Sequence, residues 1–299
     1  SGPSTGMPTR TQQSDLLSCA YASHGDTRNV LLFPSDPHEC FEMTADAFDL
    51  AERLQTPVIV MSDLDLGMND HLCTPFSWDD QRRYDRGKVL SGEELDKLEK
   101  KWGRYLDIDK DGICYRTLPG AHPDKGAYTT RGTSHNEYAA YTEGSAAYER
   151  GMNRLLSKWE TARQLVPMPE IVMRDKQKKL GAVYFGSTAA SAVEALDRLE
   201  ESNIPINSMR VKAFPFQGEV FDFIAEHELV FIIEQNRDSQ MEILLAGECQ
   251  VAPGKMMHVN NFNGLAITAR MITNQIHTTL LAREKPFISP APVAQEETP

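Results

Sequence analysis

Two separate parts of the sequence alternate strand-like and helix-like patterns, and this alternation limits the possible folds more than any other feature. In the first part, apolar runs at residues 30–33 and 57–61 predict two buried strands. Between them, Asp36, Pro37 and Glu39 have the order of a helix N-cap, a first helical residue and a capping-box acid. The helix that follows is predicted from the spacing of Phe41, Thr44, Phe48 and Ala51. A strand–helix–strand unit favours a parallel sheet with a right-handed crossover, and we expect its neighbouring strands to lie outside these 299 residues.

The second α/β unit lies nearer the C-terminal end. Apolar runs at residues 182–185, 209–214 and 229–234 predict three strands, and Gly218–Glu226 predicts a short helix. The turn Gly186-Ser187-Thr188 is expected to supply a hydroxyl cap to the next helix. Two other helices are predicted from apolar spacing, one with Val193, Leu196 and Leu199, and one with Leu265, Ala269, Ile272, Ile276 and Leu280. The predicted fold class is therefore α/β, with two parallel-sheet domains.

Residues 67–168 differ from both units and predict a long helical arm that connects them. The charged run at 93–101 is typical of a solvated helix, and a stretch rich in glycine and threonine follows. A core or interface helix is predicted from the stripe Tyr148, Met152, Leu155, Trp159 and Ala162. We therefore expect a first α/β segment, an arm, a second α/β domain and a proline-rich disordered tail, at residues 1–66, 67–168, 169–285 and 286–299.

Charge and cysteine content exclude several classes of function. A net charge of −12 argues against a nucleic-acid partner and against anionic membranes. No apolar run approaches the roughly 20 residues of a membrane span. The five cysteines are scattered without a CxxC pair, which is typical of reduced thiols in a cytoplasmic protein and predicts no metal site. Residues 107–112 resemble the start of a calcium loop, but its twelfth position is Leu118, so an acidic turn is favoured.

The first nine residues place small hydroxyl side chains between glycines and prolines. Gly2 and Gly6 permit close approach of the backbone to a ligand. Ser4, Thr5 and Thr9 supply compact donors and acceptors that suit a carboxylate or a carbonyl. The same hydroxyls would also suit the capped N-terminus of a helix, and spacing alone favours neither interpretation.

Four more polar residues are candidates for a binding role. Glu234, Asn236 and Arg237 come at the end of a predicted buried strand, where ligands and partners gather in open α/β sheets. A polar network that fixes a domain or subunit interface is the favoured role for them. Asp124 lies in a turn at residues 122–126 and is either a ligand-facing residue or a plain turn aspartate.

Several motifs, in this order, resemble the alpha subunit of 2-oxoacid:ferredoxin oxidoreductases, and the 2-oxoglutarate type most closely. Residues 2–9 with Gln13 and Asp15 are similar to the family's GPSTGxPTxxxQxDL loop. Other similar segments are residues 128–138, 213–216 followed by Glu219 and Val220, and 234–238. The resemblance runs from Ser1 to about Leu281.

The resemblance implies an enzyme that decarboxylates a 2-oxoacid with thiamine diphosphate, passing electrons to ferredoxin and the acyl group to coenzyme A. Residues 1–66 would be the second half of the pyrimidine-side thiamine domain, and residues 169–285 would resemble the C-terminal domain of transketolase. A beta subunit would hold or share thiamine diphosphate and magnesium, and it would carry the iron–sulfur cluster. Thr9, and with it Ser4, Thr5 and Asp124, would then be substrate-binding residues.

The family's YPxTP loop, its activating glutamate and a substrate arginine lie upstream of the GPSTG loop. We therefore assign no catalytic residue within this chain, and we expect an alpha subunit truncated at its N-terminus or one piece of a split gene. The alternative is a non-catalytic assembly or small-molecule-binding module derived from the same family.

Overall fold

The computed structural model describes residues 10–130 and 132–284 and contains two sheets. The strands are β1 (Val30–Leu32), β2 (Val58–Val60), β3 (Glu170–Val172), β4 (Leu180–Phe185), β5 (Asn207–Val211), β6 (Ala213–Phe214), β7 (Leu229–Glu234) and β8 (Met256–Asn260). The helices are α1 (Leu16–Ala20), α2 (Pro37–Leu54), α3 (Leu64–Met68), α4 (Gly92–Lys97), α5 (Ser145–Leu165), α6 (Thr188–Glu201), α7 (Gly218–Glu226), α8 (Gln240–Cys249) and α9 (Ala269–Glu284). The predicted α/β class is confirmed.

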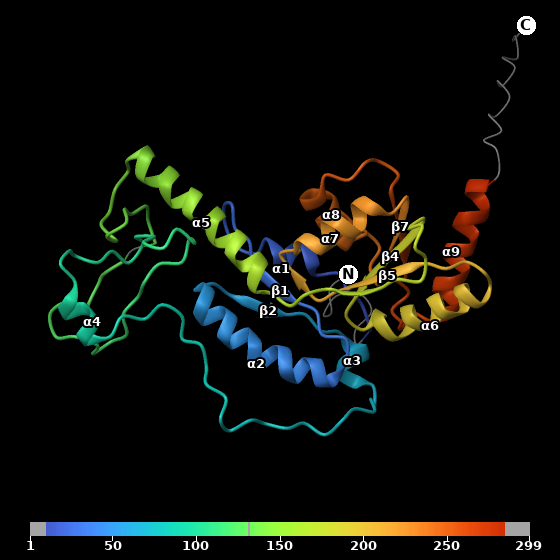
Figure 1. Ribbon diagram of the computed structural model, residues 1–299, viewed down its shortest axis with the longest axis horizontal. Helices are drawn as coiled ribbons and strands as arrows, with labels where there is room; N and C mark the ends of the chain where they lie inside the picture. The colour runs from blue at the N-terminus through green and yellow to red at the C-terminus, as the bar shows by residue number, and fades with distance from the viewer. Residues whose placement is uncertain (1–9, 131, 285–299) are drawn as a thin grey trace, which may run out of the picture.

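The larger sheet has the order β3-β5-β4-β7-β8, and only the edge strand β3 is antiparallel to its neighbour. Successive residues of β4 point to opposite faces, as the pleat requires. Val183 and Phe185 join the core with α7 and α8, whereas Ala182 and Tyr184 join the core with α6 and α9. Helices therefore cover both faces, as Figure 1 shows. This burial explains why the central strands are almost continuously apolar.

The smaller sheet has the order β2-β1-β6, with β1 parallel to β2 and antiparallel to β6. The expectation that the strands flanking the β1–β2 unit lie outside the chain is wrong for one edge, because β6, from the C-terminal unit, pairs with β1. Only Lys212 separates β5 from β6, and its carbonyl accepts a hydrogen bond from the Phe33 amide at 2.8 Å. A single stretch of chain, which lies wholly within the proposed domain at residues 169–285, thus contributes a strand to each sheet.

Helix α2 begins as predicted but packs on a different face. Asp36 caps it by accepting from the Glu39 amide at 2.8 Å. Glu39 does not complete a capping box with Asp36, since its carboxylate accepts from the amide and hydroxyl of Ser35. The predicted stripe is not the core face, and Phe48 is 67% exposed. Phe41 instead stacks on Phe76 in the extended segment that crosses the outside of α2. The residues buried toward the sheet are Met43, Ala47, Leu50 and Leu54.

Two other helical stripes differ from prediction near their ends. In α5, Trp159 and Ala162 are buried, but Tyr148 is exposed, because the first half of the helix extends with the arm away from the core. Leu265 lies before α9 and is exposed. Strands β3 and β8 and helix α8 were not predicted.

Residues 69–144 form a lobe whose only regular helix in the described part is α4 (Figure 1). Gly112 fixes this lobe against α5. It has φ +77°, and a Cβ atom at this position would overlap the backbone of Arg154 and Lys158. Lys88 binds the acidic turn beside it, with its Nζ 2.6 Å from Asp109 and 2.8 Å from Asp111.

Arg210 joins the two sheets through a buried ion-pair network. Its guanidinium, with a side chain only 7% exposed, binds Glu39 of α2 and Glu170 of β3, each at 2.6 Å. Lys212 contacts the same two carboxylates at 2.9 and 3.1 Å. Burial would raise the pKa of Glu39, but Arg210, Lys212 and the Ser35 amide hold it well below its usual value. The network therefore sets α2 against the end of β5.

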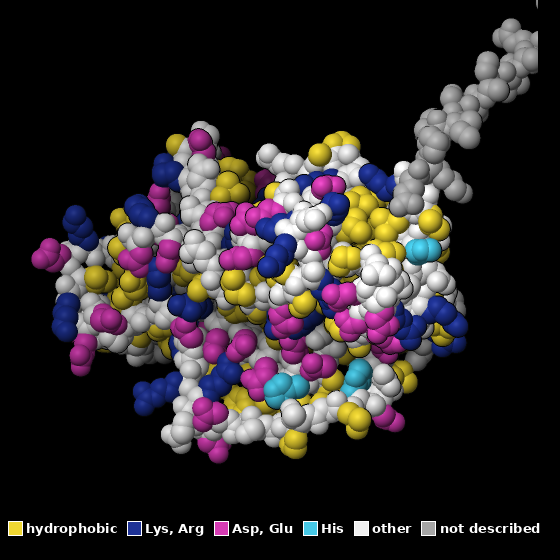
Figure 2. All heavy atoms as spheres, turned by 45° about the vertical axis from the view of Figure 1, so that its right-hand side comes forward, with side chains coloured by type: hydrophobic (Ala, Val, Ile, Leu, Met, Phe, Trp, Pro, Cys, Tyr) yellow, Lys and Arg dark blue, Asp and Glu magenta, His cyan; other side chains and the backbone are white. Residues whose placement is uncertain are grey.

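Charges of both signs alternate on the face in Figure 2, where Asp and Glu side chains lie among Lys and Arg. Within the described residues, no helix is long and apolar enough to cross a membrane.

Glu39→Gln should destabilise the chain by about 2 kcal/mol, because charge-assisted hydrogen bonds to Arg210 are lost in a buried setting. Urea unfolding would measure the change. The control is Glu194→Gln, which removes the exposed α6 pair with Arg198 and should cost under about 0.5 kcal/mol. Equal losses in both variants would contradict a special role for Glu39.

Gly112→Ala should destabilise the chain more than Gly120→Ala. Both glycines have positive φ, +77° and +82°, so both variants carry a similar backbone strain of about 1 kcal/mol. Only the methyl group added in Gly112→Ala would meet the backbone of α5, since nothing lies within 4 Å of the corresponding position at Gly120. Thermal melting and protease cleavage within residues 69–144 provide the measurement. Matching results for the two variants would refute the contact.

Candidate functional site

A cluster of buried and half-buried polar side chains lies where β4 and β7 end. We call Gln13, Asp63, Ser187, Thr188 and Gln235 the polar junction. Gln13 lies at its centre. The backbone amide of Gln13 donates to the Gln235 carbonyl at 2.8 Å, and its side-chain Nε2 donates to the Phe185 carbonyl at 3.2 Å. Its Oε1 accepts from the Gln235 amide at 3.0 Å and from the Thr188 hydroxyl at 3.1 Å. The segment that continues from residues 1–9 is thereby fixed to two strand ends.

Asp63 brings the end of the smaller sheet to the same place. It follows β2 and caps α3 by accepting from the amides of Asp65 and Leu66 at 2.9 and 3.3 Å. Its other oxygen accepts from the Ser187 hydroxyl. Burial raises the pKa of Asp63, although these hydrogen bonds partly oppose the shift. The junction thus contains a carboxyl group that is easier to protonate than an exposed aspartate.

The hydroxyls of the Gly186-Ser187-Thr188 turn do not cap α6 as predicted. Neither side chain forms a cap, because Ser187 donates to Asp63 and Thr188 donates to Gln13. Gln235 Nε2 donates to both hydroxyl oxygens, at 3.0 and 3.2 Å. Contacts between distant segments therefore take the place of a local cap.

Glu234 is completely buried and organises the start of α8. Its carboxylate accepts from the amides of Met241 and Glu242, at 2.9 and 3.3 Å, and from the Asn236 side chain. Burial raises the pKa of the Glu234 carboxyl above its usual value, although these hydrogen bonds partly oppose the shift. Asn236 also donates to the Gln13 carbonyl at 3.1 Å, which connects α8 to the polar junction. This placement is compatible with the interface role expected for Glu234 and Asn236, which stays a prediction.

Arg237 is exposed, and its guanidinium pairs with Asp238 at 2.7 Å. Both residues line a hollow of about 400 Å³, and Arg10, Thr11 and Gln12 form another part of its wall. The predicted loop residues Gly2, Ser4, Thr5, Gly6 and Thr9 lie outside the described residues. The chain enters the described region beside this hollow, because Arg10, Thr11 and Gln12 line it together with Arg237.

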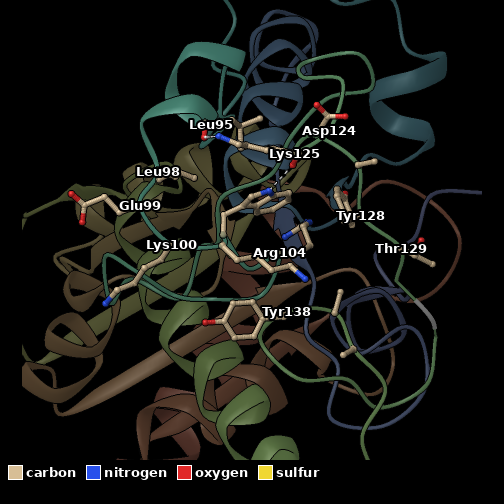
Figure 3. A pocket seen from close by; sticks show the side chains of 15 residues that line it. Leu95, Leu98, Glu99, Lys100, Arg104, Asp124, Lys125, Tyr128, Thr129 and Tyr138 are labelled. Atoms are coloured by element: carbon tan, nitrogen blue, oxygen red, sulfur yellow. Dashed lines mark hydrogen bonds between the residues drawn. The ribbon is translucent and has the colours of Figure 1, made fainter.

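Asp124 lies elsewhere, in the lobe formed by the arm. It lines a hollow of about 730 Å³ together with α4 and the segments around residues 98–104, 122–129 and 138–140 (Figure 3); we call this hollow the arm pocket. None of its lining residues belongs to the polar junction. Asp124 and the junction therefore belong to separate parts of the fold.

Among residues 10–130 and 132–284, no group of three or more His, Cys, Asp and Glu side chains could hold a metal ion. The half-buried carboxylate of Asp63 and the buried carboxylate of Glu234 are already bonded to internal donors. Sequence reasoning missed Asp63, Ser187 and Gln235 as partners of one another. A partial signal was present, because each of the three follows a predicted strand, β2 in the smaller sheet and β4 and β7 in the larger one.

The first part of the chain matches a known family model. Residues 1–74 match the model described as "Pyruvate flavodoxin/ferredoxin oxidoreductase, thiamine diP-bdg".

Curated relatives extend the similarity over most of the chain. The alpha subunit of 2-oxoacid:ferredoxin oxidoreductase 2 from Aeropyrum pernix is 31% identical over 84% of this chain and 38% of its own length. The 2-oxoglutarate synthase subunit KorA from Methanothermobacter thermautotrophicus is 35% identical over 78% of this chain and 60% of its own length. The chain thus spans about two fifths to three fifths of these relatives.

A solved structure has the same fold. The 2-oxoglutarate:ferredoxin oxidoreductase from Magnetococcus marinus, solved with 2-oxoglutarate, coenzyme A and succinyl-CoA bound, matches 93% of this chain and 46% of its own chain. The TM-score is 0.80 at 26% identity. With the family model and the relatives in agreement, this chain belongs to the alpha-subunit family of 2-oxoacid:ferredoxin oxidoreductases.

Proposed function

We propose that the chain is part of the alpha subunit of a thiamine-diphosphate-dependent enzyme that oxidatively decarboxylates a 2-oxoacid. The products would be carbon dioxide, an acyl-coenzyme A and reduced ferredoxin. The observation that supports this most is the agreement between the thiamine-binding match at residues 1–74 and the fold match over 93% of the chain.

The proposed substrate is 2-oxoglutarate. A relative that is 35% identical is named 2-oxoglutarate synthase, and the matching structure was solved with 2-oxoglutarate and succinyl-CoA. The description of the family model names pyruvate, so the match at residues 1–74 does not by itself distinguish 2-oxoglutarate from other 2-oxoacids. The proposal therefore depends on similarity over the longer alignment.

The described residues do not fit the diphosphate and magnesium end of the cofactor. They contain no metal-binding cluster, and the carboxylates at the polar junction are occupied by hydroxyl and amide donors. We assign that end of the cofactor, and the iron–sulfur cluster, to a beta subunit. No catalytic residue is assigned within this chain.

The contribution of this chain would be to position the segment at residues 1–9. Gln13 fixes the segment that follows through bonds to Phe185, Thr188 and Gln235. Side chains that are bonded to strand ends hold a binding loop more accurately than side chains in a free loop, because fewer rotations remain. We propose that Thr9, with Ser4 and Thr5, contacts the 2-oxoacid. Gly2 and Gly6 would allow the backbone to approach it.

The proposed partners are the beta subunit, ferredoxin, the 2-oxoacid and coenzyme A, in the cytoplasm. We propose neither a nucleic acid nor a membrane as a partner, since a net charge of −12 disfavours binding to polyanions and to anionic lipid.

The enzyme assembled from the alpha polypeptide that contains this chain and its beta subunit should reduce ferredoxin or a viologen dye with 2-oxoglutarate and coenzyme A. These 299 residues alone should show no turnover, because the proposed diphosphate end lies in the beta subunit. Stopped-flow or steady-state assays would measure the rate of dye reduction. An assembled complex that binds thiamine diphosphate but oxidises no 2-oxoacid would favour the non-catalytic alternative.

Thr9→Ala in the assembled enzyme should lower kcat/KM for 2-oxoglutarate about fivefold, which corresponds to loss of one hydrogen bond worth about 1 kcal/mol. The effect should be smaller for pyruvate, so the ratio of the two specificity constants should change. Steady-state kinetics on both acids would measure it.

The control is Thr44→Ala on α2, whose exposed hydroxyl bonds only the Cys40 carbonyl. That variant should leave the ratio unchanged. If Thr9→Ala lowers thermal stability without altering the ratio, Thr9 caps a helix and does not contact substrate.

A further inference from the structure

The arm pocket combines aromatic rings with cationic side chains, and the proposed function uses neither. Its volume of about 730 Å³ lies in the range of small-molecule sites. In Figure 1 the lobe that contains it projects from the two sheets beyond α5, on the side away from α9. Figure 3 shows the side chains that line this hollow, which come from α4 and from the three surrounding segments.

The residues that line the arm pocket carry a net positive charge, although the chain as a whole is strongly acidic. Its cationic residues outnumber its carboxylates by two, in a protein of net charge −12. Lys125 is partly neutralised, because its Nζ lies 3.4 Å from Asp96 outside the lining. The cations are Lys100, Lys101, Arg104 and Lys125, and the carboxylates are Glu99 and Asp124. Such a local excess attracts an anionic ligand, whereas the rest of the surface repels it.

Arg104 is held by rings, not by a carboxylate. Its guanidinium carbon lies 5.1 Å from the ring centre of Tyr105 and 5.8 Å from that of Tyr128. Within the part of the chain that the structure describes, Arg104 has no ion pair or side-chain hydrogen bond. A stacked guanidinium keeps its fork of N–H donors available, and this fork matches a phosphate group.

Trp102 and Tyr128 form a rigid aromatic corner beside it. Their ring centres are 5.6 Å apart at an interplanar angle of 87°. The indole N–H donates to the Lys125 carbonyl at 2.9 Å, which fixes the Trp102 ring. Tyr138, which is 46% exposed, lies at another side of the hollow. Trp102 is partly exposed and Tyr128 is exposed, and fixed rings of this kind are surfaces on which a planar base stacks.

We propose that the arm pocket binds a nucleoside phosphate, with its base against the Trp102–Tyr128 corner and its phosphate on Arg104. Lys100 and Lys101 add positive charge to the lining. A ligand with a planar ring but no phosphate would make no use of Arg104. A ligand with a phosphate but no ring would leave the aromatic corner uncovered. The chemistry fits either a free nucleotide or the nucleotide end of coenzyme A. The inference does not depend on the thiamine chemistry of the proposed function.

The test is calorimetric titration of the 299-residue chain with ADP, adenosine 3′,5′-bisphosphate, coenzyme A, adenosine and inorganic phosphate. The phosphorylated nucleosides should bind at least tenfold more tightly than adenosine or phosphate alone. Preference for coenzyme A over both free nucleotides would identify the coenzyme as the source, and preference for ADP would identify a free nucleotide. Absence of binding by all three nucleotides at millimolar concentration would overturn the proposal.

Variants locate the site. Arg104→Gln should weaken nucleotide binding about tenfold, while Arg270→Gln, which removes an exposed arginine on α9, should leave it unchanged. Trp102→Ala should weaken binding by about fivefold or more, and Trp102→Phe should restore part of the loss because a ring remains. Asp124→Asn should tighten binding, since it removes a carboxylate from the lining.

Circular dichroism of each variant controls for folding. If Trp102→Ala fails to fold, Arg104→Gln and Trp102→Phe decide the result. Unchanged binding in Arg104→Gln, or equal weakening by Arg270→Gln, would show that the nucleotide binds elsewhere and would refute the assignment.

Discussion

The buried guanidinium of Arg210 is the constraint on which the arrangement of the two sheets depends. Burial alone would lower the pKa of Arg210, but Glu39 and Glu170 keep it above its usual value, so the group stays charged. A charge in the interior must keep its partners, because an unpaired one is costly. One partner lies in α2 and the other in β3. Helix α2 and strands β3 and β5 therefore cannot move independently.

This coupling determines what lies at the carboxyl ends of the strands. Because β5 continues into β6, the smaller sheet is held beside the larger one, and Asp63 after β2 meets Ser187 after β4. Gln13 then bonds to Phe185 of β4 and to Gln235, which directly follows β7. This attachment of the chain at Gln13 is compatible with the substrate-contacting role that we propose for Thr9. The polar junction supports that role and needs no catalytic group of its own.

The lobe at residues 69–144 is held in place by contacts of a different kind. It contains little regular structure, and its position depends on the close approach of Gly112 to α5 and on ion pairs such as Lys88 with Asp109. Its aromatic rings lie at the surface instead of entering the common core. That exposure gives the arm pocket its chemistry, because Arg104 can stack on rings while its donors remain available.

The sequence by itself determined the α/β class, the N-cap at Asp36, the central strands and the family, because continuous apolar runs, capping residues and motifs are local properties. It did not determine which face of α2 is buried, the pairing of β6 with β1, or the partners of Ser187 and Thr188. Those features are contacts between residues far apart in the chain, such as Gln13 with Thr188 or Glu39 with Arg210. Only the tertiary structure decided them, because a hydroxyl or carboxylate takes the partner that burial brings to it, in preference to the one beside it in sequence.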